Sequence, residues 1–405
     1  MPKIRKEDKL PLRLTQLGKI YRLVEQFEEI SRIDLSKLSR LAPATITALT
    51  RELIKEKLIV ERAVQNTESR GRPAIGLCVS PFYWQSLCAT LVENRFELIL
   101  SELDGGEIKS KSYPLTTSDL VHLDQVLVQY LQQFLFETQH ELNHLITFSI
   151  AVGGELDSKN RLIKLGDVNL DLDLESLFKP YFKVPVLVTE YFQTWLMAES
   201  TLGSVINCDN VLFLQLDDVI NFSVLSKGEL LTHQHQVRSH INKMIVPKIS
   251  PLQDLISPHL ADLERYQLQH QVTHKAIYPL ITHYFPEAAL AQSEIEFLCQ
   301  KANAQNPQAQ QILHYVADSL AYILMNLVNI FDSEKIMLSS SFLSAKEVFL
   351  PRVNQTLKAN LGADYPHVEV ITGRYEWNTP VVAAAAIKQG IYDGSLLGHF
   401  IQHCF

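Results

Sequence analysis

The residues with the clearest capacity for chemistry lie on a helix expected over residues 43–55, directly after a helix over residues 31–40 and a tight turn. The outer face of the second helix carries Thr45, Thr47, Ala48, Arg51 and Lys55. A helix that enters the DNA major groove needs short side chains near its start and Arg or Lys to contact bases and phosphates. The pattern therefore predicts a helix-turn-helix; a helical hairpin that packs against another surface is the alternative.

Local signals support both helices. Ser31 and Asp34 have the spacing of a capping box, which satisfies free backbone N–H groups at a helix start. Pro43 suits a first helical turn, where its missing N–H would have no partner anyway. Apolar side chains at helical spacing then predict a buried stripe, formed by Ile46, Leu49 and Leu53.

A further helix and two strands complete a winged helix-turn-helix over residues 1–80. The first helix is expected over residues 12–27, and its inward residues are Leu17, Ile20, Leu23, Val24 and Phe27. Strands are expected over residues 58–64 and 74–79. In the loop between them, Arg70 and Arg72 flank a glycine, and such a segment can lie in a narrow minor groove. A charged turn is the alternative for these arginines.

The charge distribution separates this region from the rest of the chain. Residues 1–80 hold 16 Lys and Arg against 10 Asp and Glu; from chain totals of 37 and 45, the remainder holds 21 against 35. A basic module on an acidic body is expected when one end meets phosphates and the body stays off them. A solvated charged face is the alternative.

Composition restricts the class of protein. With 405 residues, 46% hydrophobic and 20% charged, the chain is an ordinary globular protein of several domains. It has no apolar run of membrane-spanning length and no secretory signal. Its five cysteines lie far apart without a C-x-x-C pair, which argues against a disulfide framework or a thiolate zinc site. A cytoplasmic protein without stable membrane insertion is expected.

From about residue 82, strand-like and helical runs alternate, which predicts an α/β body. The expected strands cover residues 86–92, 96–103, 144–152, 184–188, 211–216, 221–225, 335–339 and 367–372; the main expected helices cover 119–137, 173–179, 192–202, 309–331 and 381–393. We expect a first lobe over residues 81–200 and a second over 201–405 that includes the C-terminal helices. Residues 396–401 form either a detachable amphipathic helix or a simple closure of the core. No internal repeat is visible.

Four segments together resemble the ROK family of repressors and sugar kinases: the hairpin at 31–59, RGRPAIGL (70–77), LVNIFDSEKIML (327–338) and IKQGIYDGSLL (387–397). The resemblance implies a winged helix followed by a two-lobed, actin-like domain of the sugar-kinase type. It also implies a homodimer or tetramer, which would place two recognition helices on a palindromic operator.

The first lobe departs from the family's kinase pattern. The family's Gly-rich phosphate turn corresponds to residues 91–96, which contain no glycine, so backbone N–H groups cannot easily approach a phosphate. The family's catalytic His-Asp pair corresponds to Glu190-Tyr191, and a phenol is a poor base at neutral pH. A one-residue shift would instead place Glu190 at the base position. Gly153-Gly154, at the start of residues 153–157, resembles a turn of the family and could touch a ligand, although such pairs more often permit a tight turn.

The metal and nucleotide motifs are also altered. The family's sugar-binding Glu and zinc-ligating His correspond to His240 and Lys243, and a protonated lysine cannot ligate zinc. The family's zinc loop is replaced by residues 249–266, and its nucleotide-side Gly-Gly by Ser339-Ser340. His233, His235 and His240 lie close in sequence, but a solvated loop is favoured over a metal site. We therefore expect no metal and no cofactor, with a vestigial pocket at Gly153, Gly154, Glu190, Tyr191 and His240.

These observations predict a non-catalytic, DNA-binding transcriptional regulator, a repressor linked to carbohydrate metabolism genes. One alternative is control through sequestration by a protein partner, such as a transporter subunit, in place of a sugar. The other is a sugar kinase with an appended DNA-binding domain, which would need the phosphate cradle, cation clamp and positioned base that the motifs lack.

Overall fold

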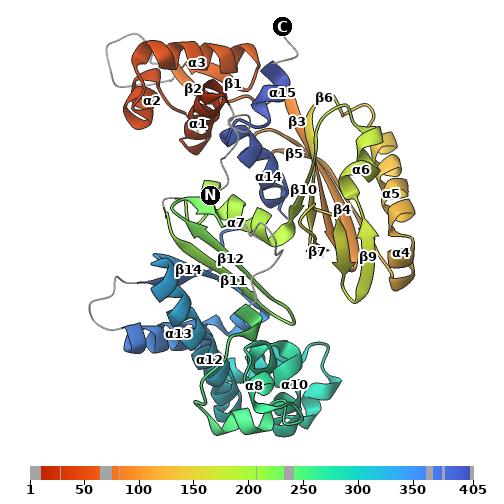
Figure 1. The fold of residues 1–405 in the computed structure, drawn as a ribbon, viewed down its shortest axis with the longest axis vertical. Coiled ribbons are helices and arrows are strands. Elements are labelled where there is room, and N and C mark those ends of the chain that lie inside the picture. The colour runs from red at the N-terminus through yellow and green to blue at the C-terminus, as the bar shows by residue number, and fades with distance from the viewer. Residues whose placement is uncertain are drawn as a thin grey trace, which may run out of the picture. The chain divides into compact units, whose positions relative to one another are not determined.

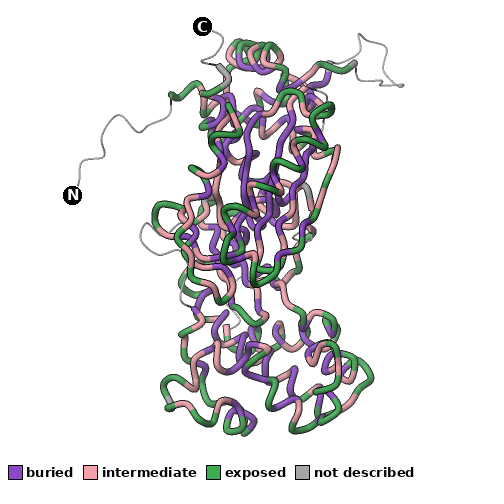
Figure 2. Tube along the Cα trace, turned by 90° about the vertical axis from the view of Figure 1, so that its right-hand side faces the viewer, coloured by how far each residue is buried: buried purple, intermediate pink, exposed green. Residues whose placement is uncertain are grey.

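The computed structural model describes residues 11–27, 29–63, 75–81, 83–206, 208–231, 241–361, 368–375 and 379–401. The chain forms two compact units. The first contains Met1–Leu202 and Tyr375–Phe405, and the second contains Gly203–Arg374. Figure 2 shows how burial varies along the chain, with buried segments inside each unit and exposed segments on the outer turns.

In its described residues, the N-terminal module contains three helices and a two-stranded hairpin (Figure 1). Its elements are α1 (Leu12–Gln26), α2 (Arg32–Ser39), α3 (Pro43–Lys55), β1 (Ile59–Ala63) and β2 (Ile75–Val79). The strands pair antiparallel, with Ile59 opposite Val79. The expected helices and strands are confirmed to within a few residues.

The inward face of α1 differs in part from the prediction. Leu17, Ile20 and Val24 are buried, whereas Leu23 is only partly buried and Phe27 is 50% exposed. The inward assignment of Phe27 is therefore wrong. The helix ends at Gln26, so Phe27 is the C-cap residue and no longer follows the helical stripe.

Ser31 starts α2 as predicted. Its side chain accepts a hydrogen bond from the Asp34 N–H at 3.2 Å, and its hydroxyl donates to the Asp34 carboxylate at 2.7 Å. The second hydrogen bond holds the carboxylate at the first turn of α2, where its negative charge interacts favourably with the positive end of the helix dipole.

Ser31→Ala is expected to lower the free energy of unfolding of the first unit by about 1 kcal/mol, because one N-terminal N–H loses its cap. Urea denaturation followed by circular dichroism measures the change. Ser158→Ala, in an exposed turn, is the control and should be neutral within about 0.5 kcal/mol. Equal losses in the two variants would contradict a capping role.

A five-stranded sheet, in the order β10-β6-β3-β4-β5, forms the body of the first unit. Its strands are β3 (Trp84–Val92), β4 (Arg95–Glu102), β5 (Glu107–Pro114), β6 (His144–Val152) and β10 (Val186–Glu190). β3, β4 and β5 form an antiparallel meander, and β6 and β10 lie parallel to β3. β10 begins two residues later than expected, after Pro185, which has no N–H to donate.

Smaller elements complete this lobe. They are α4 (Thr117–Val121), α5 (Leu123–Glu137), the three-stranded sheet β7 (Glu155–Leu156), β8 (Leu162–Leu165) and β9 (Val168–Leu172), α6 (Leu174–Phe178), η2 (Lys179–Tyr181) and α7 (Tyr191–Leu202). The helix expected over residues 119–137 is split, because His122 leaves the helical conformation at φ −123° and ψ 39°. Exposed and partly buried residues alternate along β9, and the Asp173 side chain caps α6 by accepting from the Ser176 N–H at 2.9 Å.

The second unit contains a sheet in the order β13-β12-β11-β14-β15. Its strands are β11 (Val211–Leu216), β12 (Ile220–Ser226), β13 (Glu229–Leu230), β14 (Lys335–Ser339) and β15 (Glu369–Ile371). The helices are η3 (Ile241–Lys243), η4 (Pro251–Leu255), α8 (Asp262–Arg265), α9 (Gln269–Val272), α10 (His274–Tyr284), η5 (Pro286–Leu290), α11 (Glu294–Asn303), α12 (Pro307–Phe331), η6 (Ser341–Ala345) and α13 (Lys346–Leu361). None of the helices in the described ranges has the length and apolarity needed to cross a membrane.

The two large sheets have the same topology. In each, a three-stranded antiparallel meander is followed by two strands that add in parallel beside the first strand of the meander. β11 and β14 therefore correspond to β3 and β6. This repeat is not visible in the sequence, because topology depends on the order of elements and on burial more than on residue identity.

The C-terminal helices α14 (Pro380–Tyr392) and α15 (Leu397–Ile401) belong to the first unit. Their predicted assignment to the second lobe is corrected. α14 is rich in small and apolar residues and is buried against β3, β6 and α7 on one side and α1 on the other. Leu396 and Leu397 are buried in the same core as α1, so this segment packs against the N-terminal module.

Candidate nucleic-acid interface

The outer face of α3 carries the predicted DNA-contacting residues. Thr47, Ala48, Arg51 and Lys55 are exposed, and Thr45 is partly buried. The opposite face of the helix is buried through Ile46, Leu49 and Leu53, as the apolar stripe predicts, and Thr50 is buried beside them. Among the described residues, no hydrogen bond or ion pair engages the Arg51 side chain.

Polar contacts with neighbouring elements orient α3. Thr50 donates to the carbonyl of Ile46 at 2.8 Å and accepts from Arg32 at 3.0 Å. Arg32 also forms an ion pair with Glu61 at 2.6 Å, so one guanidinium joins α2, α3 and β1. Arg13 of α1 binds Glu52 with its Nε at 3.0 Å. These contacts with α1, α2 and β1 therefore hold α3 in a fixed orientation within the N-terminal module.

The turn before α3 adds one residue, Arg40, that was not among the predicted DNA-contacting residues. Arg40 is exposed and holds φ 59° in the left-handed region as the C-cap of α2. Ala42 is the N-cap of α3 and makes no side-chain cap, so this helix start is available to an external acceptor. Its position as a basic residue within the turn of the helix-turn-helix is the sequence signal that could have identified Arg40 as a candidate DNA contact.

The predicted wing contacts, Arg70 and Arg72, lie outside the described residues. The strands that carry this loop are described, and Arg62 on β1 is exposed near its base. His240, His233 and His235 also lie outside the described residues.

In the first lobe, the structure brings four of the vestigial-pocket candidates together. Gly153-Gly154 follows β6, and Glu190-Tyr191 joins β10 to α7. Glu190 is opposite Val152 in the parallel register, and Val152 is opposite Leu91. These residues therefore meet at the carboxyl ends of parallel strands, where ligands bind in open α/β sheets.

Packing explains both glycines without a ligand. A Cβ on Gly153 would lie 2.9 Å from the Val92 side chain, and one on Gly154 would lie 2.4 Å from the Lys164 carbonyl oxygen. The place of the family's phosphate turn is a tight hairpin, with Val92 opposite Arg95. The Glu93 side chain packs against Gly166, which holds φ +57°. Protein atoms thus occupy the space near these strand ends.

Tyr191 cannot serve as a general base. It is the first residue of α7 and is 8% exposed. Burial raises the pKa of its phenol well above the ordinary value, although the nearby Arg95 charge opposes this shift. The group stays protonated at neutral pH.

In the second lobe, a carboxylate bridges the equivalent strand ends. Asp217, after β11, accepts from both the N–H and the hydroxyl of Ser341 at 2.9 Å. Ser340 donates to the Leu216 carbonyl at 2.5 Å, and Asp218 accepts from the Lys275 N–H at 3.1 Å. The nucleotide side that the resemblance implies is therefore tied together by internal hydrogen bonds.

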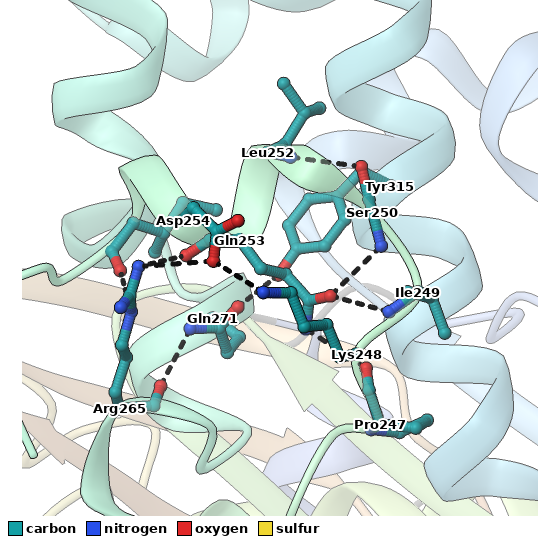
Figure 3. Close-up of polar contacts among 11 residues, drawn as sticks. Pro247, Lys248, Ile249, Ser250, Leu252, Gln253, Asp254, Arg265, Gln271 and Tyr315 are labelled. Atoms are coloured by element: carbon teal, nitrogen blue, oxygen red, sulfur yellow. Dashed lines mark hydrogen bonds and ion pairs between the residues drawn. The ribbon is translucent and has the colours of Figure 1, made fainter. Parts of the chain in front are cut away.

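A network of buried glutamines organises the segment over residues 249–266, where the resemblance implies a zinc loop in the family (Figure 3). Gln253 accepts from the N–H groups of Ile249 at 2.7 Å and Ser250 at 3.1 Å, and it donates to the Pro247 carbonyl at 3.1 Å. Arg265 donates to the Gln253 carbonyl at 2.9 Å. Both the Gln253 and the neighbouring Gln271 side chains are fully buried. Within the described ranges, no cluster of three or more His, Cys, Asp or Glu could hold a metal ion.

Comparison with known proteins agrees with this architecture. The sequence pattern of the ROK family matches residues 91–254 and 264–390. The chain is 26% identical to the DNA-binding transcriptional repressor Mlc of Escherichia coli (strain K12), over 96% of this chain and 97% of Mlc. It is 23% identical to the DNA-binding transcriptional dual regulator NagC of the same strain, over 95% of each.

A crystal structure of a ROK family transcriptional regulator, homologous to E. coli Mlc, superposes with a TM-score of 0.80 at 25% identity. It covers 96% of this chain and 99% of that structure. A ROK hexokinase from Thermus thermophilus, at 16% identity and a TM-score of 0.59, shares the fold over 76% of this chain and all of that structure. With most of its length matched, the chain belongs to the ROK family.

Proposed function

We propose that this protein is a DNA-binding transcriptional regulator, a repressor, whose proposed DNA-binding domain spans residues 1–80. The observation that carries the proposal is the outer face of α3. Its short side chains are followed by the exposed Arg51 and Lys55. A buried stripe and the Arg32 contacts hold this face outward. The relatives Mlc and NagC are named as DNA-binding regulators, which supports the assignment.

The chemistry of the body supports a non-catalytic role. Phosphoryl transfer needs a phosphate cradle, a cation clamp and a positioned base. The tight turn at Glu93 and the Asp217–Ser341 hydrogen bonds are poorly suited to form a phosphate cradle. The buried Tyr191 phenol is poorly suited to act as the positioned base. We therefore assign the output of the protein to DNA binding and not to catalysis.

The partners follow from the geometry of DNA recognition. A homodimer on a palindromic operator would present two α3 helices to half-sites one helical turn apart. A tetramer would allow two such sites. Carbohydrate metabolism genes are the proposed targets, because a relative of this chain is named as an N-acetylglucosamine repressor. Control by a protein partner remains the alternative to control by a small ligand.

Arg51→Ala is expected to weaken binding to the preferred duplex about tenfold to a hundredfold, because its guanidinium would lose base or phosphate contacts. The duplex is first enriched from a random pool with the full-length protein, and affinity is then measured by fluorescence anisotropy at fixed salt. Arg51→Lys distinguishes phosphate contact from base contact, because lysine keeps the positive charge but cannot make the bidentate hydrogen bonds by which arginine recognises guanine.

Lys183→Ala removes one exposed charge from the body and should leave affinity unchanged. Enrichment of no sequence by the wild-type protein would contradict the proposed function. Wild-type affinity in Arg51→Ala would contradict the placement of α3.

A further inference from the structure

The C-terminal segment lies directly against α1 of the N-terminal module. A Cβ on Gly18 would lie 2.2 Å from the Tyr392 carbonyl oxygen and 2.5 Å from that of Ile391. A Cβ on Gly394, which holds φ +88°, would likewise lie 2.6 Å from the Leu14 backbone. Backbone therefore meets backbone along this contact, with α1 placed between α3 and α14 (Figure 1).

A buried ionic group crosses the same contact. We call Glu25, Lys388 and Tyr392 the clasp. The Lys388 ammonium binds one Glu25 carboxylate oxygen, and the Tyr392 hydroxyl donates to the other. The ammonium also donates to the Leu103 carbonyl just beyond β4, and it lies 3.4 Å from the Tyr21 hydroxyl. The clasp therefore joins α1, α14 and the sheet in one network.

The clasp is deeply buried, so the stability of this contact depends strongly on its geometry. The Glu25 and Lys388 side chains are each 8% exposed. Burial, followed by the charge of Glu25, raises the pKa of Tyr21 and of Tyr392, so both phenols stay protonated. A buried ion pair repays its desolvation cost only in good geometry, whereas apolar side chains pack acceptably in several. The network therefore favours one orientation of α1 on α14.

A second contact fixes the other end of the module. The Trp84 indole at the start of β3 donates to the Glu56 carbonyl, at the end of α3, at 2.8 Å. The Lys57 ammonium lies 3.8 Å from the centre of the Tyr83 ring, which stacks on His144 at 4.0 Å. Two separated attachments leave a rigid body less freedom to rotate than one.

α14 also follows closely after the point where the chain returns from the second unit to the first. The chain leaves the first unit after Leu202 and returns at Tyr375. The Tyr375 N–H donates to Glu199 of α7 at 2.7 Å, and its hydroxyl donates to the Leu202 carbonyl at 2.9 Å. The segment that returns from the second unit is thus followed within a few residues by the helix that carries Lys388.

We propose that the clasp positions the N-terminal module rigidly on the first lobe, so that the body of the protein sets the separation of the two recognition helices in a dimer. Glu25, Lys388 and Tyr392 are positioning residues that do not touch DNA. This inference rests on the proposed function. Its partner is a second copy of this chain, and its consequence is a strict requirement for one spacing between half-sites.

The test compares the wild-type protein with Glu25→Gln/Lys388→Met, which removes both charges and leaves no unpaired buried ion. The enriched palindrome is lengthened at its centre by up to about five base pairs, half a helical turn, which moves one half-site to the other face of the duplex. Lys111→Met/Glu137→Gln removes an ion pair of 2.6 Å elsewhere in the first unit and serves as the matched control.

Wild type and control are expected to lose about a hundredfold in affinity for the lengthened duplex, against about tenfold or less for the clasp variant. Affinity for a duplex with a single half-site should be equal in all three proteins, because α3 itself is unchanged. A spacing penalty in the clasp variant as large as that of wild type would overturn the proposal.

Tyr392→Phe removes one hydrogen bond and keeps the ring, so it answers the question if the double variant does not fold. It should show an intermediate penalty, and a wild-type penalty would count against the clasp. If the wild-type protein enriches no sequence, the proposed function fails. If it binds DNA but all variants keep the same spacing preference, only the clasp fails.

Discussion

Gly18→Ala is expected to lower the free energy of unfolding of the first unit by about 2 to 3 kcal/mol, the cost of forcing extra volume into a packed site. The added Cβ would lie 2.2 Å from the Tyr392 carbonyl oxygen, which belongs to backbone and cannot rotate away. Alanine is the better helix former by about 1 kcal/mol, so propensity alone predicts the opposite sign. Urea denaturation followed by tryptophan fluorescence and circular dichroism measures the change.

Gly106→Ala is the matched control. The nearest atom to a Cβ at Gly106 is an Asp104 side-chain oxygen at 3.4 Å, an ordinary contact, and its φ is not in the left-handed region. This substitution should be neutral or slightly stabilising, because it restricts the unfolded chain. A Gly18→Ala protein as stable as the wild type would show that α1 does not meet α14 as closely as the structure indicates.

Gln253→Leu is expected to lower the free energy of unfolding of the second unit by about 3 kcal/mol. Leucine has a similar volume but cannot hydrogen-bond, so the N–H groups of Ile249 and Ser250 and the Pro247 carbonyl all lose their partner. Each unsatisfied buried polar group costs about 1 to 3 kcal/mol, reduced here because Ile249 and Ser250 are only partly buried.

Gln308→Leu, at an exposed position on α12, controls for the change of residue type and should alter stability by less than about 0.5 kcal/mol. Far-ultraviolet circular dichroism during urea denaturation separates the two unfolding transitions if the units unfold independently. Equal stability of Gln253→Leu and wild type would mean that the network in Figure 3 does not organise this segment.

The sequence alone determined the elements of the N-terminal module and the face of α3 that points outward. Its signals are local: the Ser31 cap, Pro43 in the first turn, and apolar residues at helical spacing through Ile46, Leu49 and Leu53. Such signals act within a few residues and need no knowledge of distant contacts. The error at Phe27 is of the same local kind, because helix ends are the least certain feature of a periodic pattern.

Sequence resemblance also predicted the two-lobed fold and the loss of kinase motifs, yet it could not say what occupies the altered positions. The structure shows Glu93 packed on Gly166, Asp217 bound to Ser341, and Gln253 at the centre of a polar network. Each of these contacts depends on side-chain geometry between separate elements. A missing motif tells which chemistry is lost but not which contacts replace it.

The placement of the C-terminal helices in the first unit and the shared topology of the two lobes became evident only from the three-dimensional fold. α14 follows the second lobe in sequence, but its small apolar residues fit between the first sheet and α1. The clasp joins Glu25 to Lys388 and Tyr392, which are separated by most of the chain. Periodicity in the sequence describes each helix separately, whereas burial against a distant partner depends on the whole fold. Contacts of this second kind attach the predicted DNA-binding helices to the first lobe.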